Sequence, residues 1–358
     1  MPTWGRILRE IGETEQLLTV QGKTGPPHPS PQDVIRRKYL EKLSAHTGRT
    51  SIVYATCWME NKEVPGQAVS VNLGDVQGFM EACYGVKSRD LDLIITSPGG
   101  SPDAAESIMD YLRTQFDHIR AIIPVAAMSA ATMMSLAADE IIMGNHSQLG
   151  PIDPQLTVMT PEGPRSAPGQ AILDQFEQAK RECQDPANIG AWLPMLRALL
   201  PGLLAQCQHS RDRAEQFART ALEAHMFAGQ PDAADKADIA AAWFADFSYF
   251  KSHGRRVSRD EARTLDLTVT DLESDPTLQD LVLSVHHAVR HTFNQTPAVK
   301  IIENDDGVAY IEAIQSQQVV INGPHPVVAA PPAPDGTGPA TAPGGNRAAR
   351  RQAARKKN

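Results

Sequence analysis

The pattern of hydrophobic and polar positions predicts that strands and helices alternate through the first half of the chain. Apolar, β-branched runs at Ser51–Ala55, Leu91–Thr96 and Ala121–Val125 have the length and composition of interior strands. Between the second and third runs, apolar residues recur at helical spacing from Ile108 to Phe116. This alternation, which continues to about residue 155, favours an α/β fold built from stacked βα or ββα units.

Helical patterning dominates on both sides of this region. The sequence predicts helices at Trp4–Leu18, Asp33–Ala45, Gln170–Cys183, Pro186–Leu200, Arg211–His225 and Ala234–Phe250, and a helix at Ala127–Ala138 within the alternating region. Thr157–Ala167 is predicted to be an exposed loop. Ser258-Arg259-Asp260-Glu261 has the spacing of a capping box and should begin a short helix.

Three segments follow from these patterns. Residues 1–31 form an N-terminal helix and a proline-rich connector, residues 32–322 form one α/β domain with helical additions, and residues 323–358 form a tail rich in proline, alanine and glycine. The tail lacks apolar periodicity, so we expect it to be disordered. Its six terminal Arg and Lys residues are best interpreted as solvated, although weak contact with an acidic partner is the alternative.

Composition narrows the class of protein. Of the 358 residues, 41% are hydrophobic and 21% charged, as in ordinary globular proteins, and the net charge of −8 argues against nucleic-acid binding by the core. The four cysteines form no Cys-x-x-Cys pair, and the chain has no strand-borne Gly-x-Gly-x-x-Gly, so we expect neither a metal nor an organic cofactor.

The same reasoning favours a cytoplasmic protein. The first 24 residues carry Arg6, Arg9 and Glu10 where a signal peptide would need an apolar core. Ala121–Ala138 is the candidate for a membrane span, but it contains Pro124 and is better explained as a strand followed by a buried helix. Membrane association remains the less favoured alternative.

The strongest chemical signal is the turn that ends the strand Leu91–Thr96. Ser97-Pro98-Gly99-Gly100 stops the strand abruptly, and two glycines permit backbone angles that other residues resist. Amide N–H groups can then point into a cleft. Such amides form an oxyanion hole, which holds negative charge on a carbonyl oxygen under attack.

A second signal follows one βα unit later. Ser129 lies in the first turn of a predicted helix, where free N–H groups and the positive end of the helix dipole favour a developing anion. This position suits a nucleophile. The alternative is that Ser129 only caps the helix, as serine commonly does.

Taken together, these motifs resemble the Clp/crotonase-fold serine peptidases. Ser97-Pro98-Gly99-Gly100, Met128-Ser129-Ala130-Ala131 and Ala138-Asp139-Glu140-Ile141 repeat a pattern shared by the Clp protease subunit and signal peptide peptidase A. His146–Gln155 is most similar to the serine dehydrogenase proteinase family, also called SDH-type Clp-fold serine proteinases. The likeness extends from about Arg36 to about Ala313.

The resemblance implies the fold, the reaction and the partners. We expect a Clp/crotonase-like domain that hydrolyses peptide bonds with Ser129 as nucleophile, while Gly99 or Gly100 and the amide of Ala130 hold the oxyanion. Relatives form rings or smaller oligomers, so a homo-oligomer acting on a peptide or protein substrate is expected. Nothing in the sequence indicates an ATPase.

The general base is left open. The stretch that matches the histidine of the Clp protease subunit, Leu149–Ile152, has no histidine. Lys180 is one candidate, as a lysine base in a predicted helix, although Gln170 stands where lysine-dependent relatives place theirs. His253 is the other, because it lies beside the position of the acidic member of the Clp triad. Asp153 would bind the base or cap its own turn.

His146 is a less favoured base. Two other functions are also weighed. A catalytically inactive scaffold would account for the missing triad histidine and for Gln170. A crotonase-type acyl-CoA hydratase or isomerase would use the glycine turn but would give Ser129 no role.

Overall fold

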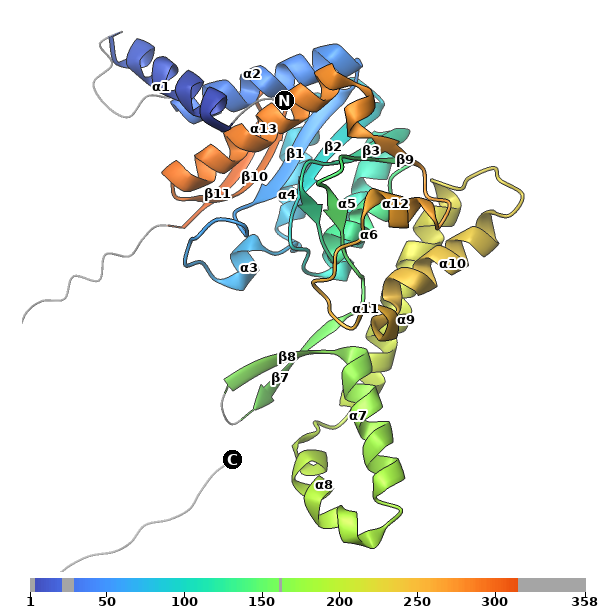
Figure 1. The fold of residues 1–358 in the computed structure, drawn as a ribbon. Coiled ribbons are helices and arrows are strands. Elements are labelled where there is room, and N and C mark those ends of the chain that lie inside the picture. The colour runs from blue at the N-terminus through green and yellow to red at the C-terminus, as the bar shows by residue number, and fades with distance from the viewer. Residues whose placement is uncertain (1–3, 21–28, 161–162, 315–358) are drawn as a thin grey trace, which may run out of the picture. The chain divides into compact units, whose positions relative to one another are not determined.

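The computed structural model describes residues 4–20, 29–160 and 163–314 of the chain (Figure 1). The predictions for the tail at 323–358 and for most of the proline-rich connector lie outside these residues.

The described residues form the following elements in chain order: α1 (Trp4–Val20), α2 (Pro31–Thr47), β1 (Thr50–Thr56), α3 (Gly66–Val69), α4 (Asp75–Cys83), β2 (Asp90–Thr96), α5 (Pro102–Gln115), β3 (His118–Ile123), β4 (Ala126–Ala127), α6 (Ala130–Leu136), β5 (Glu140–Met143), β6 (Gln148–Leu149), β7 (Gln155–Thr160), β8 (Gly163–Pro168), α7 (Gly169–Glu182), α8 (Pro186–Ala198), α9 (Leu203–Ala224), α10 (Ala233–Ala245), α11 (Phe247–Phe250), α12 (Arg259–Arg263), β9 (Val269–Asp271), a short 3-10 helix (Leu272–Ser274), α13 (Pro276–Gln295), β10 (Ala298–Asn304) and β11 (Ala309–Ala313).

The central sheet has seven strands in the order β11-β10-β1-β2-β3-β5-β9. Strands β1, β2, β3, β5 and β9 run parallel, and β10 and β11 add an antiparallel pair at the β1 edge. Two small pairs, β4 with β6 and β7 with β8, lie outside this sheet. The mixed α/β sheet confirms the predicted fold class.

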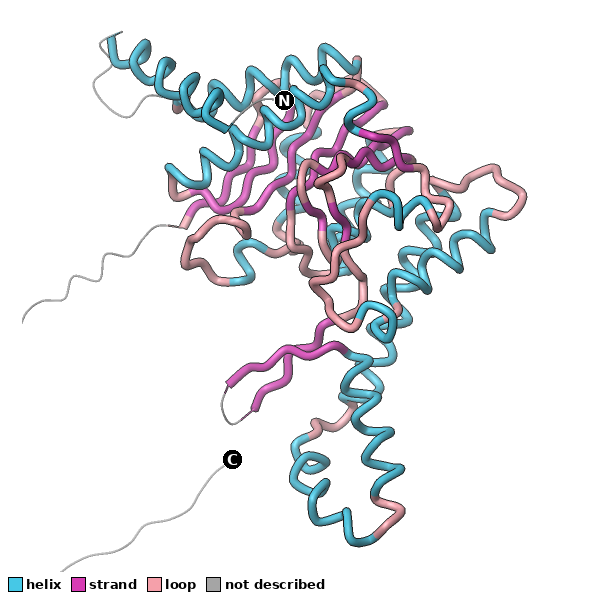
Figure 2. Tube along the Cα trace, viewed as in Figure 1, coloured by secondary structure: helices cyan, strands magenta, loops and turns pink. Residues whose placement is uncertain are grey.

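Helices cover both faces of the sheet (Figure 2). Along β1, Ile52 and Tyr54 face one hydrophobic core, and Val53 and Ala55 face the other. The first core is completed by residues of α4, α5, α6, α9 and α10, and the second by residues of α1, α2 and α13. Because both faces are covered, the parallel strands read as continuous apolar runs in the sequence.

Four predicted elements differ from the structure, and one of them is the helix predicted at Arg211–His225, which begins already at Leu203. The helix predicted at Ala127–Ala138 begins only at Ala130, because Ala126 and Ala127 pair with β6. The helix predicted at Ala234–Phe250 is interrupted at Asp246, whose carboxylate accepts the amides that begin α11. The loop predicted at Thr157–Ala167 was wrong for the residues that the structure describes there.

That segment is the antiparallel hairpin of β7 and β8, which pair from Gln155 with Pro168 to Thr160 with Gly163. A strand signal was present in β7, where Leu156 and Val158 alternate with polar residues. The partner strand contains Pro164 and Pro168, residues typical of loops, and they conceal the hairpin in the sequence.

The predicted capping box is confirmed. The Ser258 hydroxyl accepts a hydrogen bond from the Glu261 amide, and the Glu261 carboxylate accepts one from the Ser258 amide. After this helix, Asp266 takes the left-handed conformation, with φ of 60°. Asp tolerates this conformation better than most residues.

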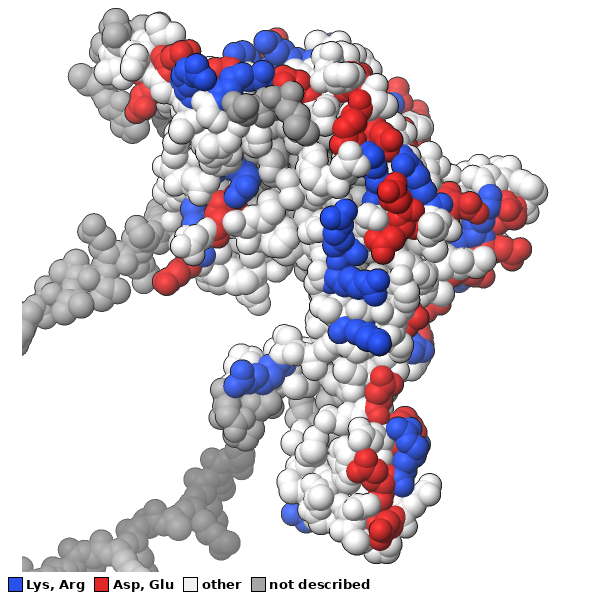
Figure 3. All heavy atoms as spheres, in the orientation of Figure 1, with Lys and Arg blue, Asp and Glu red and all other residues white. Residues whose placement is uncertain are grey.

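Charges are mixed over the surface. On the face in Figure 3, acidic and basic side chains both occur, and several basic side chains lie close together near its middle. Within the described ranges, no single helix is long and apolar enough to cross a membrane; α8 and α9 pass that test only as a pair, bent by 66°.

Candidate active site

The glycine turn after β2 is packed directly against Ser129. Gly99 has φ of 92°, and a Cβ placed there would lie 2.4 Å from the Met128 carbonyl oxygen and 2.7 Å from the Ala130 nitrogen. A Cβ at Gly100, where φ is 156°, would lie 2.4 Å from the Val71 carbonyl oxygen. Both positions therefore require glycine.

Backbone hydrogen bonds fix this turn and leave one amide unused. Val71 donates its N–H to the Gly99 carbonyl at 2.8 Å, and Ser101 donates to the Val71 carbonyl at 2.9 Å. Gly99 donates its own N–H to Ser97 Oγ at 3.2 Å. The Gly100 N–H has no partner among the described residues, and Gly100 lines a cleft. Of the two glycines, Gly100 therefore has the amide that is available to an anion.

Ser129 holds the N-cap position of α6 without capping it. Its backbone has φ of 51° and ψ of −120°, a conformation unfavourable for any residue with a Cβ, and its side chain accepts no hydrogen bond from the helix. The capping alternative is therefore not what the structure contains. Ala130 begins the helix, so its N–H has no intrahelical partner. Among the described residues, neither the Ser129 hydroxyl nor the Ala130 amide has a hydrogen-bond partner.

His253 and Asp153 meet at the same cleft. His253 Nδ1 lies 2.8 Å from Asp153 Oδ1, and the second carboxylate oxygen of Asp153 accepts a hydrogen bond from Gln155 at 2.8 Å. Asp153 is 2% exposed, whereas the His253 side chain is 27% exposed and lines the cleft. Because Nδ1 faces the carboxylate, Nε2 is the nitrogen left for a ligand or a proton.

Backbone pairing brings these two residues together from positions 100 apart in the sequence. Leu149 and Val257 exchange both backbone hydrogen bonds, at 3.0 and 2.9 Å, and so attach the loop that carries His253 to the segment that leads to Asp153. The Ile152 amide donates to the Phe244 carbonyl at 2.9 Å. The sequence carries no local signal for this pairing.

Lys180 lies elsewhere. Its side chain is 57% exposed and forms an ion pair with Glu177 at 2.9 Å on the same face of α7. It is absent from the described residues that line the cleft. A lysine that serves as a general base is normally buried, whereas this side chain is exposed and paired with Glu177. Gly99, Gly100, Ser129 and His253 line the same cleft, whereas Lys180 does not.

The cleft has a volume of about 520 Å³. Gly99, Gly100, Ser129 and His253 line it, together with residues 155–158 of β7 and residues of α9 from Leu203 to Arg213. His146 does not line the described part of this cleft.

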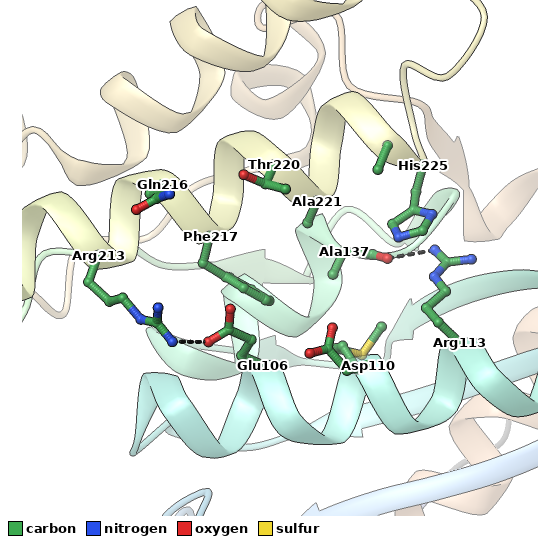
Figure 4. A pocket seen from close by; sticks show the side chains of 12 residues that line it. Glu106, Asp110, Arg113, Ala137, Arg213, Gln216, Phe217, Thr220, Ala221 and His225 are labelled. Atoms are coloured by element: carbon green, nitrogen blue, oxygen red, sulfur yellow. Dashed lines mark hydrogen bonds and ion pairs between the residues drawn. The ribbon is translucent and has the colours of Figure 1, made fainter.

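A second cavity, of about 240 Å³, lies between α5 and α9 (Figure 4). Arg113 donates to the Ala137 carbonyl, Arg213 pairs with Glu106, and His225 lies beside Arg113. Burial, with the nearby Arg113 charge, lowers the pKa of His225 below its usual value. No serine or cysteine is among the described residues that line this cavity.

No metal site accompanies either cavity. Within the described part of the chain, His, Cys, Asp and Glu side chains form no group of three that could hold a metal ion. The cleft chemistry is that of a hydroxyl, an imidazole, a carboxylate and two amides.

Comparison with known proteins agrees with the motifs. Two uncharacterized proteins of Methanocaldococcus jannaschii match parts of the chain. MJ0137 is 47% identical over 70 residues, which cover 20% of this chain and 24% of that protein. MJ1495 is 46% identical over 99 residues, 28% of this chain and 31% of that protein. The chain therefore spans less than a third of either relative.

Among solved structures, the 1510-N membrane-bound stomatin-specific protease matches with a TM-score of 0.34 and 14% identity, over 56% of this chain and 74% of that protein. Residues 76–187, which contain both the glycine turn and Ser129, match the family of ClpP-like SDH-type serine proteinases. This match confirms the predicted resemblance over residues 76–187.

Proposed function

We propose that the chain is a serine peptidase in which Ser129, His253 and Asp153 act together. The observation that supports this most strongly is the 2.8 Å contact between His253 and a buried Asp153, on the cleft that Ser129 also lines. Nucleophile, base and an acid that orients the base are the three parts of a serine triad. The match of residues 76–187 to a serine proteinase family supports the reaction class.

In this mechanism Ser129 Oγ attacks the carbonyl carbon of the peptide bond while His253 Nε2 takes the hydroxyl proton. The bond between carbon and Oγ forms, and the carbonyl oxygen becomes an oxyanion that accepts hydrogen bonds from the amides of Gly100 and Ala130. His253 then gives the proton to the leaving amine as the peptide bond breaks. Water, activated by the same imidazole, hydrolyses the acyl-enzyme. Asp153 holds Nδ1 protonated throughout.

This arrangement exchanges two partners relative to the Clp protease subunit. There, the histidine follows the serine by one strand, whereas here the corresponding turn supplies Asp153. The acid of that triad lies beside the position at which this chain has His253. An exchange of base and acid between two loops preserves the line from carboxylate to imidazole to hydroxyl, which is what the chemistry requires. It also accounts for the absence of a histidine at Leu149–Ile152.

Several properties of the whole protein remain proposals. The substrate is proposed to be a peptide or protein in extended form, the assembly a homo-oligomer, and the location cytoplasmic. The inactive scaffold is the second candidate function, and the specific observation in its favour is that Gln170 stands at the lysine position of dyad relatives. Gln170 here donates to Asp174 and accepts from Arg211.

The test is labelling with a serine-directed fluorophosphonate probe. We expect the wild-type protein to be labelled and Ser129→Ala to be silent. Ser210→Ala is the matched control, because Ser210 lines the same cleft on α9 and should leave labelling unchanged. Labelling that persists in folded Ser129→Ala would assign the nucleophile elsewhere. A folded wild-type protein that neither labels nor hydrolyses peptides would favour the scaffold.

A further inference from the structure

A fully buried polar cluster lies behind the glycine turn. It consists of Tyr54 on β1, Asp75 at the start of α4 and Lys300 on β10, and each of these side chains is 0% exposed. None of the three lines the cleft as described. Removing a cation, an anion and a hydroxyl from water is expensive, and apolar residues of similar size often give equal or greater stability. The cluster therefore needs an explanation beyond packing.

The Asp75 carboxylate is the centre of the cluster. One oxygen forms an ion pair with Lys300 Nζ. The other accepts the Tyr54 hydroxyl at 2.7 Å and the Asn72 amide at 3.0 Å. Lys300 also donates to the Ser70 carbonyl oxygen at 3.0 Å. Lys300 and Asp75 thus form hydrogen bonds with the backbone of residues 70 and 72, on either side of Val71.

Val71 is the residue that aligns the glycine turn. Its N–H donates to the Gly99 carbonyl at 2.8 Å, and its carbonyl accepts Ser101 at 2.9 Å. These two bonds bracket Gly100 and leave its N–H unpaired toward the cleft. A shift of Val71 would therefore rotate the Gly100 amide. The ion pair fixes Val71 through Ser70 and Asn72, and this is the first connection between the cluster and the site.

A second connection runs through Tyr54. The Ser97 and Tyr54 side chains are neighbours, and Ser97 Oγ accepts a hydrogen bond from the Gly99 N–H at 3.2 Å. Burial, reinforced by the neighbouring Asp75 charge, raises the pKa of Tyr54 well above its usual value of 10. Tyr54 therefore stays protonated and keeps donating to Asp75. The turn is held from both ends, at Gly99 through Tyr54 and at Gly100 through Val71.

We propose that Tyr54, Asp75 and Lys300 are positioning residues that set the direction of the Gly100 amide for the oxyanion. This inference rests on the proposed peptidase function. It assigns the cluster to the transition state, in which the oxyanion exists, and not to substrate binding. Loss of one member should lower kcat and leave KM nearly unchanged, because an amide aimed at the oxyanion acts only once the charge has developed.

Tyr54→Phe is the decisive variant, because it removes one oxygen atom and keeps the ring in place. We expect a decrease in kcat of about tenfold or more with KM within about twofold, since loss of a direct oxyanion donor costs about 10² to 10³ in rate. The affinity for a peptide aldehyde, which mimics the tetrahedral adduct, should fall in parallel, and fluorophosphonate labelling should slow. Tyr310→Phe is the matched control, since its hydroxyl donates to Glu312 at 3.3 Å and to no other group among the described residues.

A second pair of variants separates positioning from folding. Lys300→Met and Arg36→Met each break a buried ion pair with a partner on a different element, Asp75 and Glu303 respectively. Both should lower stability, and only Lys300→Met should lower kcat per folded molecule. If Lys300→Met does not fold, Tyr54→Phe decides the question alone.

If the wild-type protein is labelled but the Tyr54→Phe variant keeps the wild-type kcat and aldehyde affinity, this inference is overturned and the proposed peptidase function stands. An unlabelled, inactive wild-type protein would overturn the proposed function, and with it the inference.

Discussion

Strand β10 places one buried charged side chain on each face of the sheet. Lys300 points to the face that carries the cleft and pairs with Asp75, whereas Glu303 points to the opposite face and pairs with Arg36 and Arg37 of α2. Arg36 also donates to Thr292 of α13 at 3.0 Å. The second pair ties helices to the sheet and touches no residue of the cleft. The pair of Lys300 and Asp75 holds the backbone segment around Val71, which orients the Gly100 amide.

The comparison indicates that burial of an ion pair does not by itself mark a function. The role of an ion pair depends on which parts of the structure its two residues hold in place. The pair at Glu303 holds elements that would otherwise separate, so its loss should appear in the free energy of unfolding. The pair at Lys300 sets the orientation of the Gly100 amide, so its loss should appear in kcat. The predictions below test that division, from the largest expected effect to the smallest.

The largest effect is expected on the cleft side, at the acid that orients the base. Asp153→Asn preserves size but should turn the imidazole to the wrong tautomer, and kcat should fall by about 10³ to 10⁴. The melting temperature should change little, because the amide still fills the site. Steady-state kinetics on a peptide substrate provides the measurement.

Lys180→Ala is the control for that experiment, and its activity should equal the wild type because the side chain is exposed and paired with Glu177. Loss of activity in Lys180→Ala, with Asp153→Asn unaffected, would return the base to the lysine.

The next effect belongs to the opposite face. Arg36→Met should lower the free energy of unfolding by about 3–5 kcal/mol, because it leaves Glu303 buried without its main partner. Urea unfolding followed by circular dichroism measures this. The kcat of the remaining folded protein should match the wild type. A lowered kcat would remove the contrast between the two faces of β10.

A pH dependence is expected at α13. His286 is fully buried, and burial, together with the charges of His287, Arg290 and His146, lowers its pKa to about 3. In the unfolded chain it takes up a proton below about pH 6.5. The folded state is then penalised as pH falls, so stability is complete above pH 6.5 and decreases toward pH 3.

Between pH 7 and pH 5, His286 should remove about 2 kcal/mol from the free energy of unfolding. Unfolding of the wild type and of His286→Leu at both pH values measures the difference, which should shrink by that amount in the variant. Equal pH dependence of the two proteins would contradict the assignment.

The smallest effect concerns Asp266, which takes a left-handed conformation that glycine adopts without strain. Asp266→Gly should stabilise the protein by about 0.5–1 kcal/mol, since relief of strain is partly offset by the greater freedom of glycine in the unfolded chain. Asp266→Asn should change stability little, and thermal unfolding compares the three proteins. A destabilised Asp266→Gly would show that the Asp side chain contributes locally.

The parts of this molecule that were predicted from sequence are those with local causes. The strand ending at Thr96, the turn at Gly99 and Gly100, and the capping box at Ser258 each depend on a few adjacent residues. The sequence could not choose between the amides of Gly99 and Gly100, because that choice depends on Val71, a residue far from the turn in sequence.

The base was left open for the same reason. A helical apolar stripe near Lys180 indicates one side of a helix, but whether another element covers that side is a tertiary fact. His253 reaches Asp153 through the bridge between Leu149 and Val257, whose register no local pattern specifies. The hairpin of β7 and β8 was missed because its second strand contains prolines.

The backbone of Ser129 carries a further consequence. With φ of 51° and ψ of −120°, it occupies a region that glycine visits freely and other residues resist. Ser129→Gly should therefore make the protein more resistant to heat while it removes the proposed nucleophile. Selection for stability alone would replace this serine, so its presence records a compromise in which the fold accepts local strain to keep a hydroxyl in the cleft.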